Sequence, residues 1–230
     1  MRRRRLSVMA HAAEVVLEIG SIDLTGDLIV PSGAKGIVLF AHGSGSSRRS
    51  SRNRAVATAL HDAGLGTLLF DLLSDEEEAV DARTAELRFD IPLLAERLLG
   101  ATRWVEAADE LSDLRVGYFG ASTGAAAALV AAADSPRVGA IVSRGGRPDL
   151  AGSALAGVIC PTLLIVGGED VRVIAMNEEA LEQLRCEKRL DIVPGATHLF
   201  EEPGALERVS ELASDWFVDK LTDAPAVRRS

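Results

Sequence analysis

The sequence predicts a three-layer α/β domain: a mostly parallel sheet with helices on both faces and an antiparallel hairpin at its N-terminal end. The first observation is a set of short, largely apolar runs, at 36–41, 67–70, 116–119, 140–142 and 162–166. Such runs are typical of strands that are buried on both faces. The second observation is the set of helical stretches between and after them, at 53–63, 91–108, 124–133, 177–184 and 205–221. This alternation favours a parallel sheet with right-handed crossovers.

The hairpin is predicted from two β-rich runs, 13–19 and 22–30, which Gly20 and Ser21 join. We expect residues 13–222 to form a single domain, with a basic flexible tail at 1–12 and a C-terminal tail at 223–230. The arginines at 2–5 precede an apolar run that is too short for a signal peptide, so a frayed tail is favoured over a targeting or lipid-binding segment. No run approaches the roughly 18 apolar residues of a membrane span.

Composition limits the classes of function. The chain has 230 residues, of which 47% are hydrophobic and 26% charged, as in an ordinary globular protein. Its net charge of -9 disfavours binding to nucleic acid. Cys160 and Cys186 show no metal-binding or redox spacing, and we expect both to be buried and reduced in the cytoplasm. The partners expected are therefore a small-molecule substrate and neither nucleic acid nor membrane, with a homo-oligomer left open.

The pentapeptide Gly120-Ala121-Ser122-Thr123-Gly124 is the strongest functional signal. It follows a predicted strand at 114–119 and opens an alanine-rich helix, which is the context of a G-x-S-x-G nucleophile elbow. The sharp turn strains the serine, and glycines let neighbouring backbone pass. Ser122 is therefore expected at the carboxyl end of its strand and at a helix N-terminus, where free N–H groups favour a developing negative charge.

A serine nucleophile needs a base and a group that orients the base. His198 lies in the loop after a strand at 189–193, and Asp170 follows the apolar strand at 162–166. The order Ser122, Asp170, His198 is that of α/β-hydrolase triads. Glu169 is a rival for the acid. Asp71, at another strand end, is an alternative acid but is favoured as a brace for neighbouring loops.

These motifs together resemble the α/β-hydrolases of the dienelactone hydrolase-like group, from about residue 13 to 221. The resemblance rests on HGSG at 42–45, GASTG at 120–124, GGED at 167–170 and the loop of His198. It implies an oxyanion hole made by the backbone N–H groups of Thr123 and Ser44, and a structural role for His42 in preference to a catalytic one. Dienelactone hydrolases use a cysteine nucleophile, whereas this elbow holds Ser122, so the lactone substrate does not transfer.

Further charged groups lie near the predicted site. Arg144 follows a buried strand and is flanked by glycines on its C-terminal side, and binding of a substrate anion and a structural salt bridge are equally favoured for it. For the arginines at 48, 49, 52 and 54, salt bridges are the favoured interpretation. For the acidic stretch 74–90, a solvated loop or helix is favoured over a substrate lid. Residues 143–160 are too few to hold a cap domain, which predicts a shallow, open site.

The resulting hypothesis is a serine hydrolase that cleaves a small carboxylic ester, thioester or lactone through an acyl-enzyme on Ser122. Asp170 would orient His198, Thr123 and Ser44 would hold the oxyanion, Arg144 would bind substrate, and no metal or organic cofactor would be needed. The alternative is a non-catalytic protein of the same fold that binds a ligand or partner.

Overall fold

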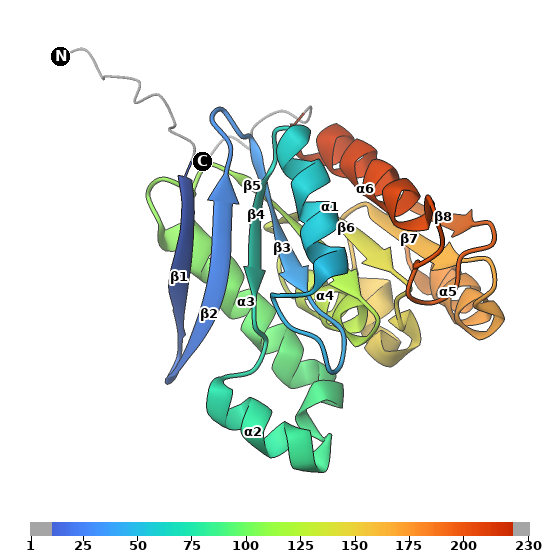
Figure 1. Cartoon of the computed structure of the whole chain (residues 1–230), viewed down its shortest axis with the longest axis horizontal. Coiled ribbons are helices and arrows are strands. Elements are labelled where there is room, and N and C mark those ends of the chain that lie inside the picture. Colours follow the sequence, from blue (N-terminus) through green and yellow to red (C-terminus); the bar gives the residue numbers. More distant parts are fainter. Residues whose placement is uncertain (1–10, 223–230) are drawn as a thin grey trace.

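The computed structural model describes residues 11–222 (Figure 1). Of the predicted tails, residues 11 and 12 belong to the first strand, and the remainder lies outside the described residues. Eight strands form one sheet in the order β1-β2-β4-β3-β5-β6-β7-β8. Their bounds are β1 His11–Ile19, β2 Ile22–Val30, β3 Gly36–Ala41, β4 Gly66–Phe70, β5 Arg115–Ala121, β6 Val138–Arg144, β7 Thr162–Gly167 and β8 Lys188–Val193.

The pairing of the strands confirms the predicted sheet. β1 and β2 form an antiparallel hairpin along their whole length, from His11 opposite Val30 to Ile19 opposite Ile22. β2 then pairs antiparallel with β4, while every other neighbouring pair is parallel. The carboxyl ends of β3, β4, β5, β6, β7 and β8 therefore lie at one edge of the sheet.

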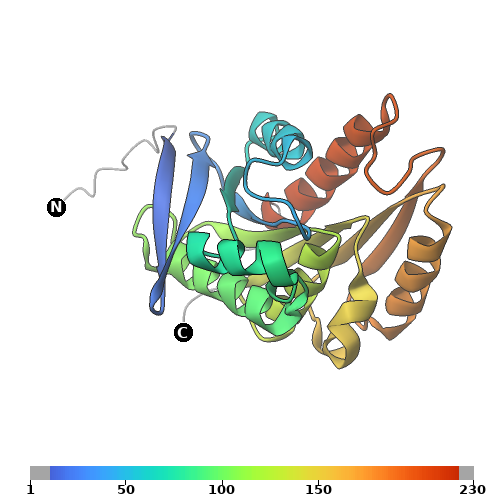
Figure 2. The ribbon, with the colours of Figure 1, turned by 60° about the horizontal axis from the view of Figure 1, so that its bottom comes forward.

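Helices cover both faces of the sheet, as predicted. Figure 2 shows α1 and α6 on one face and α3, α4 and α5 on the other. The α-helices are α1 Ser51–Asp62, α2 Asp75–Thr84, α3 Ile91–Ala107, α4 Thr123–Ala133, α5 Val171–Gln183 and α6 Ala205–Thr222, and the 3₁₀ helices are η1 Leu87–Phe89 and η2 Pro148–Gly157. The sequence placed the start of α5 at residue 177, six residues late, because its first turn lacks a side-chain cap that would mark it.

The apolar runs are fully buried because each central strand faces two cores. In β5, Tyr118 packs into the cluster beneath α3 and α4, while the adjacent Phe119 packs into the cluster beneath α1 and α6. Successive side chains of a strand point to opposite faces, so both must be apolar here. Among the described residues, no helix is long and apolar enough to cross a membrane.

One smaller expectation, on the two cysteines, needs correction. Cys160 is buried, and burial raises the pKa of its thiol to about 12, but Cys186 is only half-buried. His61 is half-buried and hydrogen-bonds through Nε2 to the hydroxyl of Thr67 at 2.7 Å. The acidic stretch forms a helix, α2, with a capping box at Ser74 and Glu77, and it lies against the edge of the sheet that holds the strand ends.

Arg48 ties the loop between β3 and α1 to the hairpin and to the end of β4. Its guanidinium is 8% exposed and pairs with Glu14 of β1, Asp27 of β2 and Asp71 after β4, at 2.9, 2.5 and 3.1 Å. The Arg48 N–H also donates to Asp71 at 2.7 Å. Burial alone would lower the pKa of Arg48, but the three carboxylates together raise it. Asp71 therefore braces this loop, which is the role favoured from the sequence.

Replacing Arg48 should destabilise the fold. In Arg48→Met the three carboxylates would lose their shared cation, and we expect the free energy of unfolding in urea to fall by about 2 kcal/mol, since these acids keep partial access to water. Arg49→Met is the matched control, because the neighbouring Arg49 is exposed and its side chain makes no ion pair with a described residue. Equal effects of the two variants would contradict a role for this ion-pair network.

Candidate active site

The residues with catalytic chemistry lie at the edge where the parallel strands end. Ser122 follows β5, Asp170 follows β7 by three residues, and His198 lies in the loop after β8. His42 directly follows β3 and Arg144 is the last residue of β6. Ligand sites of open α/β sheets occur at this position, because the strand order places these loops side by side.

Ser122 occupies a strained turn between β5 and α4. Its φ of 51° and ψ of -120° fall in a region that a non-glycine residue rarely adopts. A Cβ at Gly120 would overlap the backbone of Ala125, and one at Gly124 would overlap the carbonyl oxygens of Ala41 and His42. The two flanking glycines are thus required sterically. The Ser122 side chain does not cap α4, so its hydroxyl stands free at the helix N-terminus.

Adding a methyl group at Gly124 should disrupt the turn. In Gly124→Ala the new Cβ meets rigid backbone at the end of β3, and we expect a loss of about 3 kcal/mol in the free energy of unfolding. Gly157→Ala is the matched control, because its Cβ would make an ordinary contact of 3.4 Å with Ala133, and we expect it to stay within about 1 kcal/mol of the parent. Thermal or urea unfolding of both variants checks this; similar stabilities would refute the steric argument.

Asp170, and not Glu169, meets His198. The Nδ1–H of His198 donates to Oδ2 of Asp170 at 2.7 Å, which leaves Nε2 of the imidazole available. The Glu169 side chain is exposed instead. The hydroxyl of Ser122 makes no hydrogen bond with any residue between 11 and 222 in this structure. The backbone nevertheless joins the two segments: the Ser122 N–H donates to the Arg144 carbonyl at 3.3 Å, and Gly145 lies against His198.

Two features hold the loop of His198 in place. A Cβ at Gly167 would overlap the carbonyl of Ala196, so this glycine lets the loop approach the end of β7. Glu202 accepts hydrogen bonds from the N–H and the hydroxyl of Thr197, at 3.1 and 2.6 Å. Sequence reasoning missed Glu202, since an acid five residues away from Thr197 shows no recognisable spacing.

His42 supports the loop that leads to Ser44. Its Nδ1–H donates to the Gly43 carbonyl at 3.0 Å, and its Nε2 accepts from the N–H of Leu72 at 3.1 Å. Both ring nitrogens are therefore engaged, and neither is left to take a proton from Ser122. Burial lowers the pKa of His42, against smaller opposing effects of Gly43, Asp71 and Glu78. The geometry supports a structural role.

The buried, neutral His42 should make stability depend on pH. Its folded-state pKa lies below the unfolded value, so below about pH 6.5 the unfolded chain binds a proton that the folded chain does not. We expect the free energy of unfolding to fall by about 1 kcal/mol between pH 7 and pH 5.5 on this account. Urea unfolding across this range should show a shallower pH dependence in His42→Gln.

The matched variant is His61→Gln. Burial lowers the pKa of the half-buried His61 in the same direction, so this variant should also reduce the slope, but by less. An unchanged slope in His42→Gln would contradict the assignment of His42 as a buried neutral imidazole.

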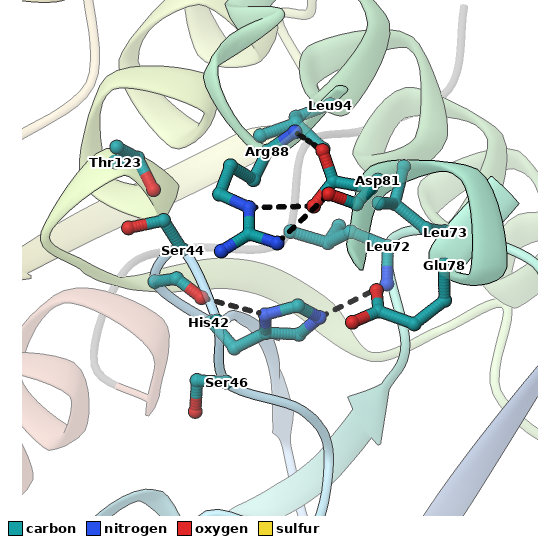
Figure 3. A pocket seen from close by; sticks show the side chains of 12 residues that line it. His42, Ser44, Ser46, Leu72, Leu73, Glu78, Asp81, Arg88, Leu94 and Thr123 are labelled. Atoms are coloured by element: carbon teal, nitrogen blue, oxygen red, sulfur yellow. Dashed lines mark hydrogen bonds and ion pairs between the residues drawn. The ribbon is translucent and has the colours of Figure 1, made fainter. Parts of the chain in front are cut away.

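A small cavity of about 10 Å³ adjoins the predicted oxyanion hole (Figure 3). Ser44 and Thr123 lie on one side of it, and Asp81, Arg88 and Leu94 on the other. Arg88 donates to Asp81 through Nε at 2.6 Å and through its backbone N–H at 3.0 Å, and Asp81 is almost fully buried. The segment of α2 and η1 thus forms a wall of this cavity.

The arginines differ sharply in their partners. Arg48, Arg52 and Arg54 pair with carboxylates, as favoured from the sequence, whereas Arg49, for which a salt bridge was also expected, is exposed and forms none with a described residue. Arg144 forms none with these residues either. Its guanidinium is 8% exposed, lies 6.0 Å from the centre of the Phe119 ring and makes no hydrogen bond or ion pair with a described residue. Burial, with a smaller contribution from Arg52, lowers the pKa of Arg144 to about 10.

Known proteins with similar sequences or structures share this fold. The model of the dienelactone hydrolase family matches residues 24–219. A crystal structure of dienelactone hydrolase from Anabaena variabilis ATCC 29413 is 62% identical, with a TM-score of 0.91 over 92% of this chain and 99% of that one. Est1E from Butyrivibrio proteoclasticus is 15% identical and shares the fold, with a TM-score of 0.75 over 90% of this chain and 98% of its own.

Curated relatives of Mycobacterium tuberculosis, from strains CDC 1551 and H37Rv, are 57% identical over 210 residues. These cover 90% of this chain but 46% of each relative, so the chain spans about half the length of the curated relatives it matches. Both relatives are provisionally named phosphoribosyl transferases. That name is given to proteins of which more than half lies outside the region that matches this chain.

Proposed function

Because this chain belongs to the dienelactone hydrolase family, we propose that it is a serine hydrolase that cleaves a small carboxylic ester, thioester or lactone. The observation that carries the proposal is the positive φ of Ser122 at the edge of the sheet, together with the hydrogen-bonded pair of His198 and Asp170 on the loops after β8 and β7. The strained turn exposes a hydroxyl that makes no structural hydrogen bond, which is what a nucleophile requires.

The proposed reaction proceeds in two halves. The Oγ of Ser122 attacks the carbonyl carbon while Nε2 of His198 takes the hydroxyl proton, and His198 then gives that proton to the leaving oxygen or sulfur. Water, activated by the same nitrogen, releases the acid from the acyl-enzyme. Asp170 accepts from Nδ1–H, which fixes the tautomer that leaves Nε2 free and stabilises the imidazolium as it forms.

The oxyanion would be held by the backbone N–H groups of Thr123 and Ser44. Thr123 is the first residue of α4, so its N–H has no acceptor within the helix and belongs to the positive end of the helix dipole. Ser44 lies on the same side of the small cavity as Thr123, on the loop that His42 supports. Loss of one such donor typically reduces the rate by about 10² to 10³.

The small cavity beside this hole sets the expected size of the acyl group. Leu72, Leu73 and Leu94 contribute apolar surface to it, and Arg88 and Asp81 form its outer wall. A cavity of about 10 Å³ has room for about one water molecule, which favours the smallest acyl groups over longer chains.

A fluorophosphonate probe tests the nucleophile. We expect covalent labelling of the parent protein at Ser122, and in Ser122→Ala both the labelling and the hydrolysis of 4-nitrophenyl acetate should be lost, the latter by at least about 10⁴-fold in kcat/KM. Ser153→Ala removes an exposed hydroxyl on η2 and should leave labelling intact.

A folded parent protein that is not labelled would overturn the proposal and favour the non-catalytic, ligand-binding alternative. Labelling that persists in Ser122→Ala would instead place the nucleophile on another residue. Peptide mapping of the labelled protein separates these outcomes.

A further inference from the structure

Asn177 is a fully buried polar residue on α5, two turns after Asp170. Its side-chain nitrogen Nδ2 donates to the carbonyl of Val173, in its own helix, at 2.7 Å and to the carbonyl of Gly146 at 3.0 Å. Both hydrogens of the amide are therefore used, and the opposite orientation would place Oδ1 against two carbonyl oxygens. The Oδ1 atom is buried and accepts no hydrogen bond from residues 11–222. This side chain thus acts as a donor only.

The Gly146 carbonyl belongs to the loop between β6 and η2, which holds the predicted nucleophile by its backbone. The carbonyl of Arg144 accepts the N–H of Ser122 at 3.3 Å, and the N–H of Arg147 donates to the carbonyl of Ser122 at 3.1 Å. The same carbonyl accepts the N–H of Ala125 at 3.1 Å, within the first turn of α4. The bond from α5 therefore anchors a loop that contacts both backbone groups of the predicted nucleophile.

The hydrogen bonds pass through two peptide groups in succession. The carbonyl of Gly146, which accepts from Asn177, shares its peptide group with the N–H of Arg147. This N–H donates to the carbonyl of Ser122, which shares the second peptide group with the N–H of Thr123. Neither peptide is cis, so the carbonyl and the N–H of each point in opposite directions. A donor to the carbonyl therefore fixes the direction of the N–H and also polarises it.

We propose that Asn177 is a positioning residue for the oxyanion hole. Its amide orients the peptide before Arg147, that peptide orients the one before Thr123, and the Thr123 N–H is thereby held toward the oxyanion and strengthened as a donor. The inference rests on the proposed hydrolase function, and Asn177 acts through the backbone without touching the substrate. Its effect falls on the transition state, because the negative charge on the carbonyl oxygen develops only there.

Asn177→Leu tests this role, because leucine has a similar size and no donor. We expect kcat for 4-nitrophenyl acetate to fall about 10- to 100-fold while KM stays within about twofold of the parent, since both halves of the reaction use the same oxyanion donor. The affinity for 1,1,1-trifluoroacetone, which forms a tetrahedral oxyanion with a serine nucleophile, should fall by a similar factor.

Thr102→Val is the matched control. It also removes a buried hydrogen bond, from the Thr102 hydroxyl to the Leu98 carbonyl at 3.0 Å, but on α3 and outside the proposed chain of bonds. It should lower Tm about as much as Asn177→Leu does and leave both kcat and the affinity for the ketone unchanged. If Asn177→Leu does not fold, Asn177→Ala removes the donor without adding bulk and takes its place in each measurement.

The amide of Arg147 gives a readout that needs no turnover. In Asn177→Leu this amide proton should exchange with solvent about 5-fold faster than in the parent, which is the factor of one hydrogen bond. Its NMR resonance should also move upfield, because its bond to Ser122 loses polarisation. Thr102→Val should leave the resonance in place.

The outcomes separate the two proposals. If fluorophosphonate does not label the parent but the Arg147 amide depends on Asn177, the hydrolase is overturned and the chain of hydrogen bonds is retained. If the parent is labelled and active, a kcat of Asn177→Leu that falls no further than that of Thr102→Val would overturn the positioning role alone. An unchanged Arg147 resonance would overturn it too, as would a raised KM at constant kcat, which would indicate substrate binding instead.

Discussion

The close passage of α4 beneath the end of β3 is the contact on which the rest of the site depends. Gly124 lies against the carbonyl oxygens of Ala41 and His42 with no room for a side chain. This contact brings the N-terminus of α4 next to the loop that begins at His42, so Thr123 and Ser44, the residues proposed to hold the oxyanion, line the same small cavity. It also forces the chain to turn abruptly after β5, which is why Ser122 accepts an unfavourable backbone conformation.

Residues outside the candidate site hold the loops on its two sides in place. On one side, His42 joins the end of β3 to the end of β4, and Arg48 joins the same loop to the hairpin. On the other side, Gly167 and Glu202 fix the loop of His198. The N-terminal hairpin therefore does more than extend the sheet, because its acids anchor a loop that is distant in sequence. Positions of catalytic groups within fractions of an ångström depend on this kind of support.

The sequence was most informative where a local pattern has one structural solution. The apolar runs predicted the parallel strands, and the glycines around Ser122 predicted the turn, because both patterns are short and sterically exclusive. That Arg144 lacks an acidic partner among the described residues could not be predicted, since pairing depends on which acids the fold brings near, and Glu201 pairs with the neighbouring Arg52 instead. The pairing of Asp81 with Arg88 could not be predicted either, because both residues lie in a stretch whose composition favoured a solvated loop or helix.

The segment of α2 and η1 differs from the other walls of the site in how it is attached. It enters after β4 and leaves into α3 at one edge of the molecule, and it contributes no strand to the sheet (Figure 1). Its fold is fixed largely from within, by the capping box at Ser74 and the bonds between Asp81 and Arg88, with Arg97 of α3 bound to Glu77. The length and side chains of this segment can therefore change without altering the turn at Ser122 or the loop of His198. Under the proposed function, selectivity for acyl groups could then evolve separately from the chemistry.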